Sequence, residues 1–215
     1  MSTAPHVEHR VPGFSLRDCV KACVFAVCVV IVSPPIIVTW LEKRLSRSEL
    51  LFVSLSQLLA VIPAFPGTWL RAAFYWGALE HCSWQVHVGF GSVFSHRGAS
   101  MGRRASIGAY CVIGHADLGE EVMVGSRVSI PSGKRQHLDD EGRLSSETPR
   151  FDRVRVGAHA WIGEGAILLA DVGAGSIVSA GAVVIERMPE GVLIGGNPAR
   201  VIRPMDRASA ASPGV

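Results

Sequence analysis

The sequence predicts an all-β solenoid of short parallel strands that follows an N-terminal helical, membrane-associated region. Two observations carry this prediction. Apolar residues are concentrated in the first 80 residues, and from about residue 88 an aliphatic residue followed by glycine recurs at intervals of about six. The 215 residues suffice for one domain and an appendage. With 48% apolar residues, 18% charged residues and a mean hydropathy of +0.32, the chain is neither disordered nor a coiled coil.

Charge and cysteine content exclude two kinds of site. The net charge of +3 is too small for electrostatically driven binding of nucleic acid, so no nucleic-acid partner is expected. The five cysteines are odd in number and have no zinc-site spacing. We therefore predict packing cysteines in a reducing compartment and no metal site.

Residues 1–80 are predicted to be the helical membrane-anchoring region. Residues 22–41, ACVFAVCVVIVSPPIIVTWL, are 20 consecutive uncharged residues, which as a helix would match a hydrocarbon layer of about 30 Å. A cleaved signal peptide is the alternative, but no small-x-small site follows the run. A second apolar stretch, residues 50–70, predicts an interfacial helix broken at Pro63.

The orientation of the first segment stays open because basic residues flank it on both sides, with Arg17 and Lys21 before it and Lys43 and Arg44 after it. A single span is one reading. The other is a helix that breaks at Pro34-Pro35, dips into one leaflet and returns.

Six-residue spacing defines the rest of the chain. Each aliphatic residue is expected to point into a core, and each glycine to relieve crowding where the backbone bends. One step of five residues precedes Leu118, and one step of four precedes Val172. The aliphatic-glycine pairs are Val88-Gly89, Met101-Gly102, Ile107-Gly108, Ile113-Gly114, Leu118-Gly119, Val124-Gly125, Val156-Gly157, Ile162-Gly163 and Val172-Gly173.

These hexads, together with the closing run GGNPARVIR at residues 195–203, resemble the left-handed β-helix acyltransferases of the hexapeptide-repeat family, such as galactoside, maltose and colanic-acid O-acetyltransferases. The resemblance implies a left-handed parallel β-helix over residues 81–203, with residues 204–215 as a flexible tail. It also implies a homotrimer, and acetyl-CoA as co-substrate bound between adjacent subunits.

The hexads stop over residues 131–155, which hold six basic and five acidic side chains and form the predicted catalytic loop. His137 is one of eight histidines, and a loop histidine is more often just solvated. Family members, however, carry a catalytic histidine in this loop, and His137 lies 24 residues before Trp161. The resemblance thus implies that His137 is the general base. Asp139 and Asp140 could orient it or bind the acceptor, or could simply be solvated.

The resemblance also assigns coenzyme contacts one by one. Trp161, Glu164, Ala180 and Gly181 would line the pantetheine arm, although Glu164 departs from the small or polar residue that relatives often have there. Arg200 and Arg203 would dock the nucleotide end, since guanidinium groups suit phosphate oxygens; exposed surface arginines are the alternative reading. His159 is expected to be a turn residue or a coenzyme contact.

The resulting expectation is an O-acetyltransferase that transfers the acetyl group of acetyl-CoA to a hydroxyl of a sugar, such as a polysaccharide precursor or lipid-linked saccharide. It would be held at the bacterial inner membrane with the catalytic domain facing the cytoplasm. Two alternatives stay open: an acetyltransferase for a soluble small molecule such as serine or an antibiotic, and a non-catalytic β-helix scaffold.

Overall fold

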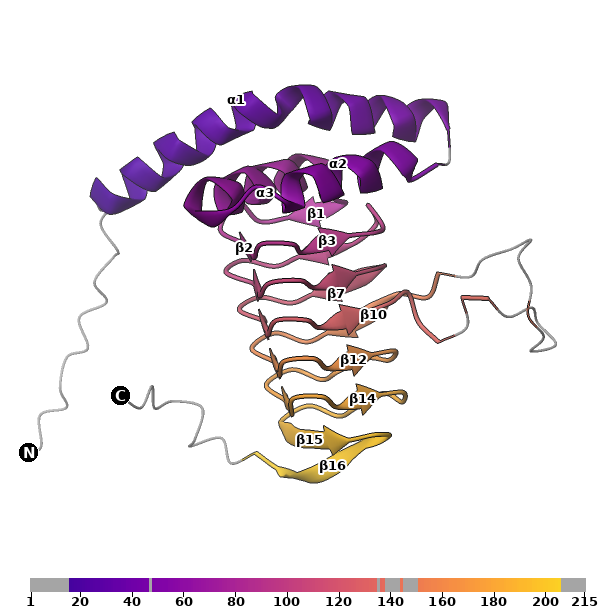
Figure 1. Ribbon diagram of the computed structural model, residues 1–215. Coiled ribbons are helices and arrows are strands. Elements are labelled where there is room, and N and C mark those ends of the chain that lie inside the picture. The colour runs from indigo at the N-terminus through magenta and orange to yellow at the C-terminus, as the bar shows by residue number, and fades with distance from the viewer. Residues whose placement is uncertain (1–15, 47, 135, 138–143, 145–150, 206–215) are drawn as a thin grey trace, which may run out of the picture.

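The structure, a computed structural model, describes residues 16–205 apart from positions 47, 135, 138–143 and 145–150. Three helices cover one end of a parallel β-solenoid of about six turns (Figure 1). The predicted fold class, an all-β solenoid behind a helical region, is confirmed. The helices are α1 (Leu16–Leu45), α2 (Leu50–Ala60) and α3 (Ala64–Ala78).

The solenoid has three faces, each a sheet built from one short strand per turn. Sheet A contains β1 (His81–Cys82), β4 (Ser100–Met101), β7 (Ala116–Leu118) and β10 (Val154–Val156). Sheet B contains β2 (His87–Val88), β5 (Ser106–Ile107), β8 (Met123–Val124), β11 (Trp161–Ile162), β13 (Ile177–Val178), β15 (Val192–Gly196) and the antiparallel β16 (Ala199–Pro204). Sheet C contains β3 (Val93–Phe94), β6 (Val112–Ile113), β9 (Ser129–Ile130), β12 (Ile167–Leu168) and β14 (Val183–Val184).

The hexads fold this way because the second residue of each two-residue strand points inward and the first points outward. Val88, Ile107 and Ile162 are fully buried and stack in the core, as predicted for the repeat. The glycine after each aliphatic residue allows neighbouring turns to approach closely. A Cβ on Gly108 would lie 2.7 Å from the carbonyl carbon of Gly125 in the next turn.

Sharp corners join the sheets, and at most corners between sheets A and B and at those between sheets B and C one residue has a positive φ. Between sheets A and B the corner residue is not glycine in the middle turns; His159, for example, has φ 59° and so occupies the turn position expected for it. Its N–H donates to the carbonyl of Glu120 in the preceding turn (2.9 Å). The other corner residues with positive φ are Arg104, Glu121, Gly175 and Gly191 between sheets A and B, and Gly91, Tyr110, Arg127, Gly165 and Gly181 between sheets B and C.

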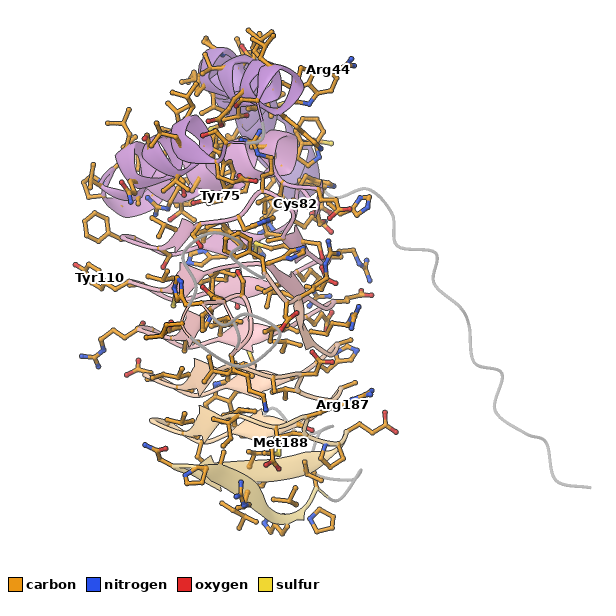
Figure 2. The ribbon with its side chains drawn as sticks, turned by 90° about the vertical axis from the view of Figure 1, so that its right-hand side faces the viewer. Arg44, Tyr75, Cys82, Tyr110, Arg187 and Met188 are labelled. Atoms are coloured by element: carbon orange, nitrogen blue, oxygen red, sulfur yellow. The ribbon has the colours of Figure 1, made fainter. Side chains whose placement is uncertain are left out.

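The two irregular steps of the repeat both fall on sheet A. The five-residue step leads into β7, which has three residues in place of two. After the four-residue step, Val172 makes only isolated bridges, to Val156 and Met188, so sheet A continues without a further named strand. Figure 2 shows Met188 low in the stack, with Arg187 projecting outward beside it and Tyr110 projecting from the other side.

α1 is one continuous helix through Pro34 and Pro35, so the break considered at this pair is not present. Proline lacks the N–H that would bond the carbonyl four residues earlier. Pro34 would leave the carbonyl of Val30 without its donor, but the Ser33 hydroxyl donates to that oxygen at 2.8 Å. The break predicted at Pro63 is confirmed, because α2 ends at Ala60 and α3 begins at Ala64.

One face of α1 packs on α3, through Phe25, Cys28 and Val32. Below them Tyr75 of α3 is fully buried, its hydroxyl is hydrogen-bonded to Ser56 of α2, and its ring contacts Phe94 of the first turn. Figure 2 places Tyr75 at the level where the helices meet the solenoid. The helices therefore form a cap that shares the apolar core of the solenoid.

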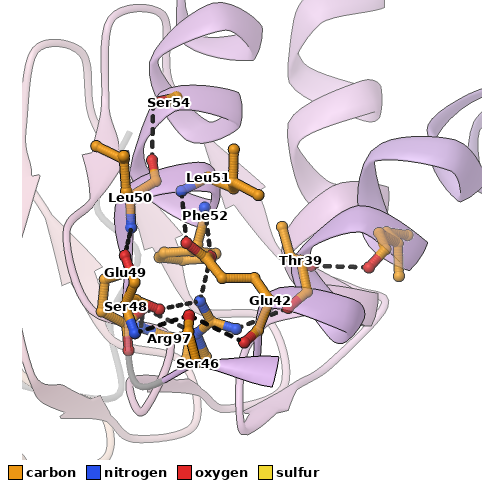
Figure 3. A network of polar contacts seen from close by, with 11 residues as sticks. Thr39, Glu42, Ser46, Ser48, Glu49, Leu50, Leu51, Phe52, Ser54 and Arg97 are labelled. Carbon is orange, nitrogen blue, oxygen red and sulfur yellow. Dashed lines mark hydrogen bonds and ion pairs between the residues drawn. The ribbon is translucent and has the colours of Figure 1, made fainter. Parts of the chain in front are cut away.

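A buried polar network also ties the cap to the first turn (Figure 3). Arg97 donates to the Glu42 carboxylate, to the Thr39 carbonyl at 2.7 Å and to Glu49 at 2.9 Å. The same Glu42 carboxylate accepts the backbone N–H of Leu51 at 2.8 Å and so caps the start of α2. One carboxylate and one guanidinium thus connect α1, α2 and the solenoid.

At the other end of the solenoid, β16 continues to Pro204, and Met205 N–H donates to the carbonyl of Gly191 at 2.7 Å. The strand therefore includes position 204, where the tail was expected to begin, and Met205 is still hydrogen-bonded to the solenoid. Residues 206–215 lie outside the described residues.

Candidate active site

The hexads are interrupted between β9 and β10, where the chain leaves sheet C and returns on sheet A (Figure 1). The base of this insertion is attached to the solenoid. Asp152 N–H donates to the carbonyl of Ser132 (3.0 Å), and the Ser132 hydroxyl accepts the N–H of His115 (2.8 Å). Lys134 Nζ donates to the carbonyl of Ile185, two turns further along (3.4 Å).

His137 lies in a turn near the start of the insertion, and its side chain is exposed. Just before it, the Gln136 amide donates to the carbonyl of Gly133 (3.4 Å), which folds this part of the insertion back on its base. Asp139 and Asp140, considered as partners of the imidazole, lie outside the described residues. The imidazole of His137 is therefore accessible to an acceptor from solvent.

A second charged group, which sequence reasoning missed, holds the returning end of the insertion. Arg153 Nε donates to His115 Nε2 at 3.0 Å, so His115 carries its proton on Nδ1 and donates it to the carbonyl of Phe151 (3.2 Å). The other nitrogens of Arg153 bond Asp117 on β7 (3.1 Å) and Glu80 at the end of the cap (2.7 Å). The hydrogen bond from Arg153 holds the pKa of Glu80 below its ordinary value.

His96 completes this group. Its ring stacks on that of His115, with centroids 4.5 Å apart, and its Nδ1 accepts the N–H of Gly98 (3.1 Å). Burial lowers the pKa of His96, an effect that Glu49 only partly offsets, so the ring is neutral at pH 7. The signal in the sequence was the five-residue step before Leu118, which marks the turn where His115 and Asp117 lie.

The residues predicted to bind the coenzyme lie on the side of sheet B. Trp161 is the outward residue of β11 and is half exposed, in register with Met123 and Ile177 on the neighbouring strands. Glu164 lies at the corner between sheets B and C, and its backbone carbonyl accepts the N–H of Gly181 from the next turn (2.8 Å).

Ala180 directly precedes Gly181 at the same corner. Arg200 and Arg203 extend from β16 at the end of sheet B, where each guanidinium bonds a neighbouring backbone carbonyl, that of Ala199 (2.8 Å) and that of Pro204 (3.2 Å). Both side chains are exposed, so their remaining donors face solvent.

One chain does not bring the two predicted halves of the site together. The insertion with His137 leaves at the corner between sheets C and A, which is opposite sheet B in a three-sided solenoid. Trp161 and the two arginines lie on sheet B itself. Among the residues that the structure describes, no group of three or more His, Cys, Asp or Glu side chains is placed to hold a metal ion.

Several solved structures with the same architecture are acetyltransferases. A maltose O-acetyltransferase from Clostridium difficile 630 superposes over 73% of this chain and 86% of its own, with 20% identity and a TM-score of 0.62. The chain has the hexapeptide-repeat acetyltransferase fold. A galactoside acetyltransferase in complex with coenzyme A shares this fold over 77% of the present chain and 84% of its own (17% identity, TM-score 0.63).

A third neighbour is a hexapeptide-repeat acetyltransferase from Vibrio cholerae O1 biovar eltor complexed with acetyl coenzyme A. It superposes over 91% of this chain and 92% of its own length (19% identity, TM-score 0.55). The superposition identifies the solenoid as the left-handed β-helix that the resemblance implied. No family model matches the sequence.

Curated relatives match shorter segments of the hexapeptide-repeat chain. A 2,3,4,5-tetrahydropyridine-2,6-dicarboxylate N-acetyltransferase of Clostridium perfringens is 44% identical over 63 residues, 28% of this chain and 25% of that protein. Serine acetyltransferase 2 of Arabidopsis thaliana is 34% identical over 113 residues, 47% of this chain and 31% of that protein. The matches thus span about a quarter to a third of the relatives' own length.

Proposed function

We propose that the protein is an O-acetyltransferase that uses acetyl-CoA to acetylate a hydroxyl of a sugar held at the membrane, in a polysaccharide precursor or lipid-linked saccharide. The observation that carries the proposal is the insertion with its exposed His137, in a solenoid whose matched segments are 34–44% identical to acetyltransferases. Maltose and galactoside acetyltransferases among the structural neighbours support a sugar acceptor.

In this mechanism the imidazole of His137 removes the proton of the acceptor hydroxyl as the oxygen attacks the thioester carbonyl. The tetrahedral intermediate collapses, the C–S bond breaks, and the thiolate of coenzyme A takes the proton back from His137. Backbone N–H groups of the turns would stabilise the oxyanion. No redox step or metal is required, and the products are the acetyl ester and free coenzyme A.

Trp161, Glu164, Ala180 and Gly181 would line the pantetheine arm along sheet B, and Arg200 and Arg203 would bind phosphate oxygens. Glu164 already forms an ion pair with Arg127 (3.5 Å), so its carboxylate would not face the pantetheine arm unpaired.

We propose a homotrimer because the site needs a second copy. His137 leaves from the corner opposite sheet B, so the insertion of one subunit would meet sheet B of its neighbour. The outward residues of sheets B and C include large exposed apolar side chains, among them Met123, Trp161, Val112 and Ile167. Such a surface is typical of an interface. On sheet A the outward residues are polar instead, for example Asp117 and Arg155.

The cap is proposed to lie on the cytoplasmic face of the bacterial inner membrane, where acetyl-CoA is available. α1 is long and apolar enough to cross a bilayer. Only 22% of its most apolar window is buried inside the protein, so most of its apolar surface is free to contact lipid. Its packing on α3 and the Glu42–Arg97 ion pair hold it across the end of the solenoid (Figure 1). These contacts favour a helix embedded in one leaflet, with its basic residues Arg17, Lys21, Lys43 and Arg44 near the headgroups.

The acceptor is tested with the full-length protein in native membranes and in detergent, with acetyl-CoA and detection of the released thiol. Lipid-linked saccharides, free sugars, serine and amino-sugars would be compared. We expect turnover with saccharide hydroxyls and higher turnover in membranes. A preference for serine would favour the second candidate, a soluble-substrate enzyme, which the similarity to serine acetyltransferase 2 supports. No turnover with any acceptor would favour a scaffold.

A further inference from the structure

A cavity of about 610 Å³ lies where the cap meets the solenoid. Three parts of the chain line it: the start of α1 with Lys21, the first half of α3 with Phe65 and Trp69, and the first two turns of the solenoid, with Trp84 and Arg104 at corners and His87 on β2. None of these residues belongs to the predicted acetyl-transfer site. The cavity therefore has no role in the mechanism above.

One side of the cavity is aromatic. The rings of Phe65 and Trp69 contact each other, with centroids 5.7 Å apart, and Trp84 contacts Phe25 of α1 at 5.8 Å. Val20, which directly precedes Lys21 on α1, is an exposed apolar side chain. Tryptophan prefers the boundary between headgroups and acyl chains. This wall therefore fits an apolar chain that comes from the bilayer.

The other side of the cavity is cationic. The described lining residues include Lys21 and Arg104 and no carboxylate. Arg104 forms an ion pair with Glu121 (3.0 Å), a residue that does not line the cavity. Burial, and next the nearby Arg71, lower the pKa of His87, so this ring is neutral at pH 7 and available for hydrogen bonding.

Arg71 adds a buried positive charge behind the wall. It is fully buried, and its acceptors are uncharged: the carbonyls of Val88 (3.0 Å), Leu59 (3.1 Å) and Ile62 (2.8 Å), and the hydroxyl of Thr68. A buried charge without a counter-ion favours an anion nearby. Since Thr68 lines the cavity, the charge of Arg71 lies just behind it.

We propose that this cavity binds a membrane lipid with a phosphate headgroup. Lys21 and Arg104 bind the phosphate oxygens, and Phe65, Trp69 and Trp84 pack against the start of the apolar chain. A free anion would not need the aromatic wall, and a neutral lipid would not need the cations. The proposal rests on the membrane position proposed above. It adds that the cap binds one specific lipid, besides lying on the membrane surface.

The test uses the full-length protein purified in a neutral detergent. Phosphatidylglycerol, a long-chain isoprenyl phosphate, diacylglycerol and inorganic phosphate are titrated, and bound lipid is measured by native mass spectrometry. We expect both phosphate-headed lipids to bind, and diacylglycerol and inorganic phosphate to bind far more weakly. Tighter binding of the isoprenyl phosphate than of phosphatidylglycerol would support a lipid-linked acceptor as the occupant, and the reverse would support a bilayer lipid.

The Lys21→Glu, Arg104→Asn double variant should bind these lipids at least about tenfold more weakly, the loss expected for charge-assisted hydrogen bonds. Its matched control is Lys43→Glu, Arg103→Asn, which changes a lysine at the other end of α1 and the neighbouring arginine, neither of which lines the cavity. Asparagine is chosen at position 104 because it tolerates the positive φ of this residue.

Equal losses in both double variants would mean general attraction to basic residues and would overturn the assignment. So would binding of inorganic phosphate as tight as that of the lipids. Thermal unfolding without lipid checks that each variant is folded. Thiol release from acetyl-CoA is measured in parallel. A wild-type protein that turns over acetyl-CoA but binds neither phosphate-headed lipid would refute the cavity assignment alone and leave the proposed enzyme standing.

Discussion

The guanidinium of Arg97 and the carboxylate of Glu42 form a buried ion pair that joins the first turn of the solenoid to the last turns of α1. The two residues are 55 positions apart in the chain, and both side chains are less than a tenth exposed. Their contact makes the cap part of the folded domain.

Arg97→Met should destabilise the protein by about 3–5 kcal/mol, because it leaves the Glu42 carboxylate buried without a counter-ion. Chemical denaturation in detergent measures the change. Arg103→Met is the control: this arginine pairs with Glu120 on the exposed surface, so the loss should stay below about 1 kcal/mol. Equal losses would show that the buried pair contributes no more than a surface pair.

His137→Asn should lower kcat by about 10²–10⁴-fold, the usual contribution of a general base. Because the side chain is exposed, oligomeric state and thermal midpoint should not change. The control is His159→Asn at an exposed corner, where asparagine tolerates φ 59° and turnover should be retained. Unchanged turnover in the His137 variant would remove this residue from the mechanism.

Arg153→Leu should loosen the returning end of the insertion, because it removes the hydrogen bonds to His115, Asp117 and Glu80. We expect faster proteolysis within residues 131–153 and a lower kcat, with the affinity for coenzyme A unchanged, since Arg153 positions the insertion and is not part of the coenzyme surface. Arg153→Lys should restore part of both. A fall in coenzyme affinity with normal proteolysis would contradict this positioning role.

The Glu80–Arg153 pair also predicts a pH effect. The pKa of Glu80 is lower in the folded protein than its ordinary value of 4.5, so its stabilising contribution is present above pH 4.5 and is lost as the pH falls through the folded-state pKa. Thermal midpoints of the wild type and Glu80→Gln should therefore differ at pH 7, and the difference should shrink as the pH falls below 4.5 and through the folded-state pKa. The difference is small, because the Glu80 side chain is 43% exposed. A gap that persists at low pH would point to a cause other than ionisation.

Val112→Asp should weaken the proposed trimer, because it places a carboxylate among the outward apolar residues of sheet C. Mass photometry would show a shift from trimer to monomer at equal protein concentration. Arg187→Asp places the same side chain on the sheet A side, where the residue projects to solvent (Figure 2), and should leave assembly intact. A monomeric wild type would refute the trimer directly.

The repeat was predictable because it is local: each hexad contains its own inward residue and its own glycine, as at Ile107-Gly108. The sequence left open whether the helix breaks at Pro34-Pro35. The structure shows a continuous helix, in which the hydroxyl of the preceding Ser33 supplies the donor that Pro34 lacks, a compensation that composition does not reveal. The cluster of His115 and Arg153 was missed because it joins residues 38 positions apart, and only the topology of the solenoid brings them together.

The direction of the solenoid has a further consequence. Its turns succeed one another away from the cap, and the insertion leaves from β9, two strand spacings beyond β3, which corresponds to about 10 Å. If the cap lies at the bilayer and the insertion carries the chemistry, as proposed, the number of turns before the insertion would set the distance between the membrane surface and the hydroxyl that is acetylated. One additional turn would move the chemistry outward by about 5 Å and select a more distant position on a membrane-held sugar chain.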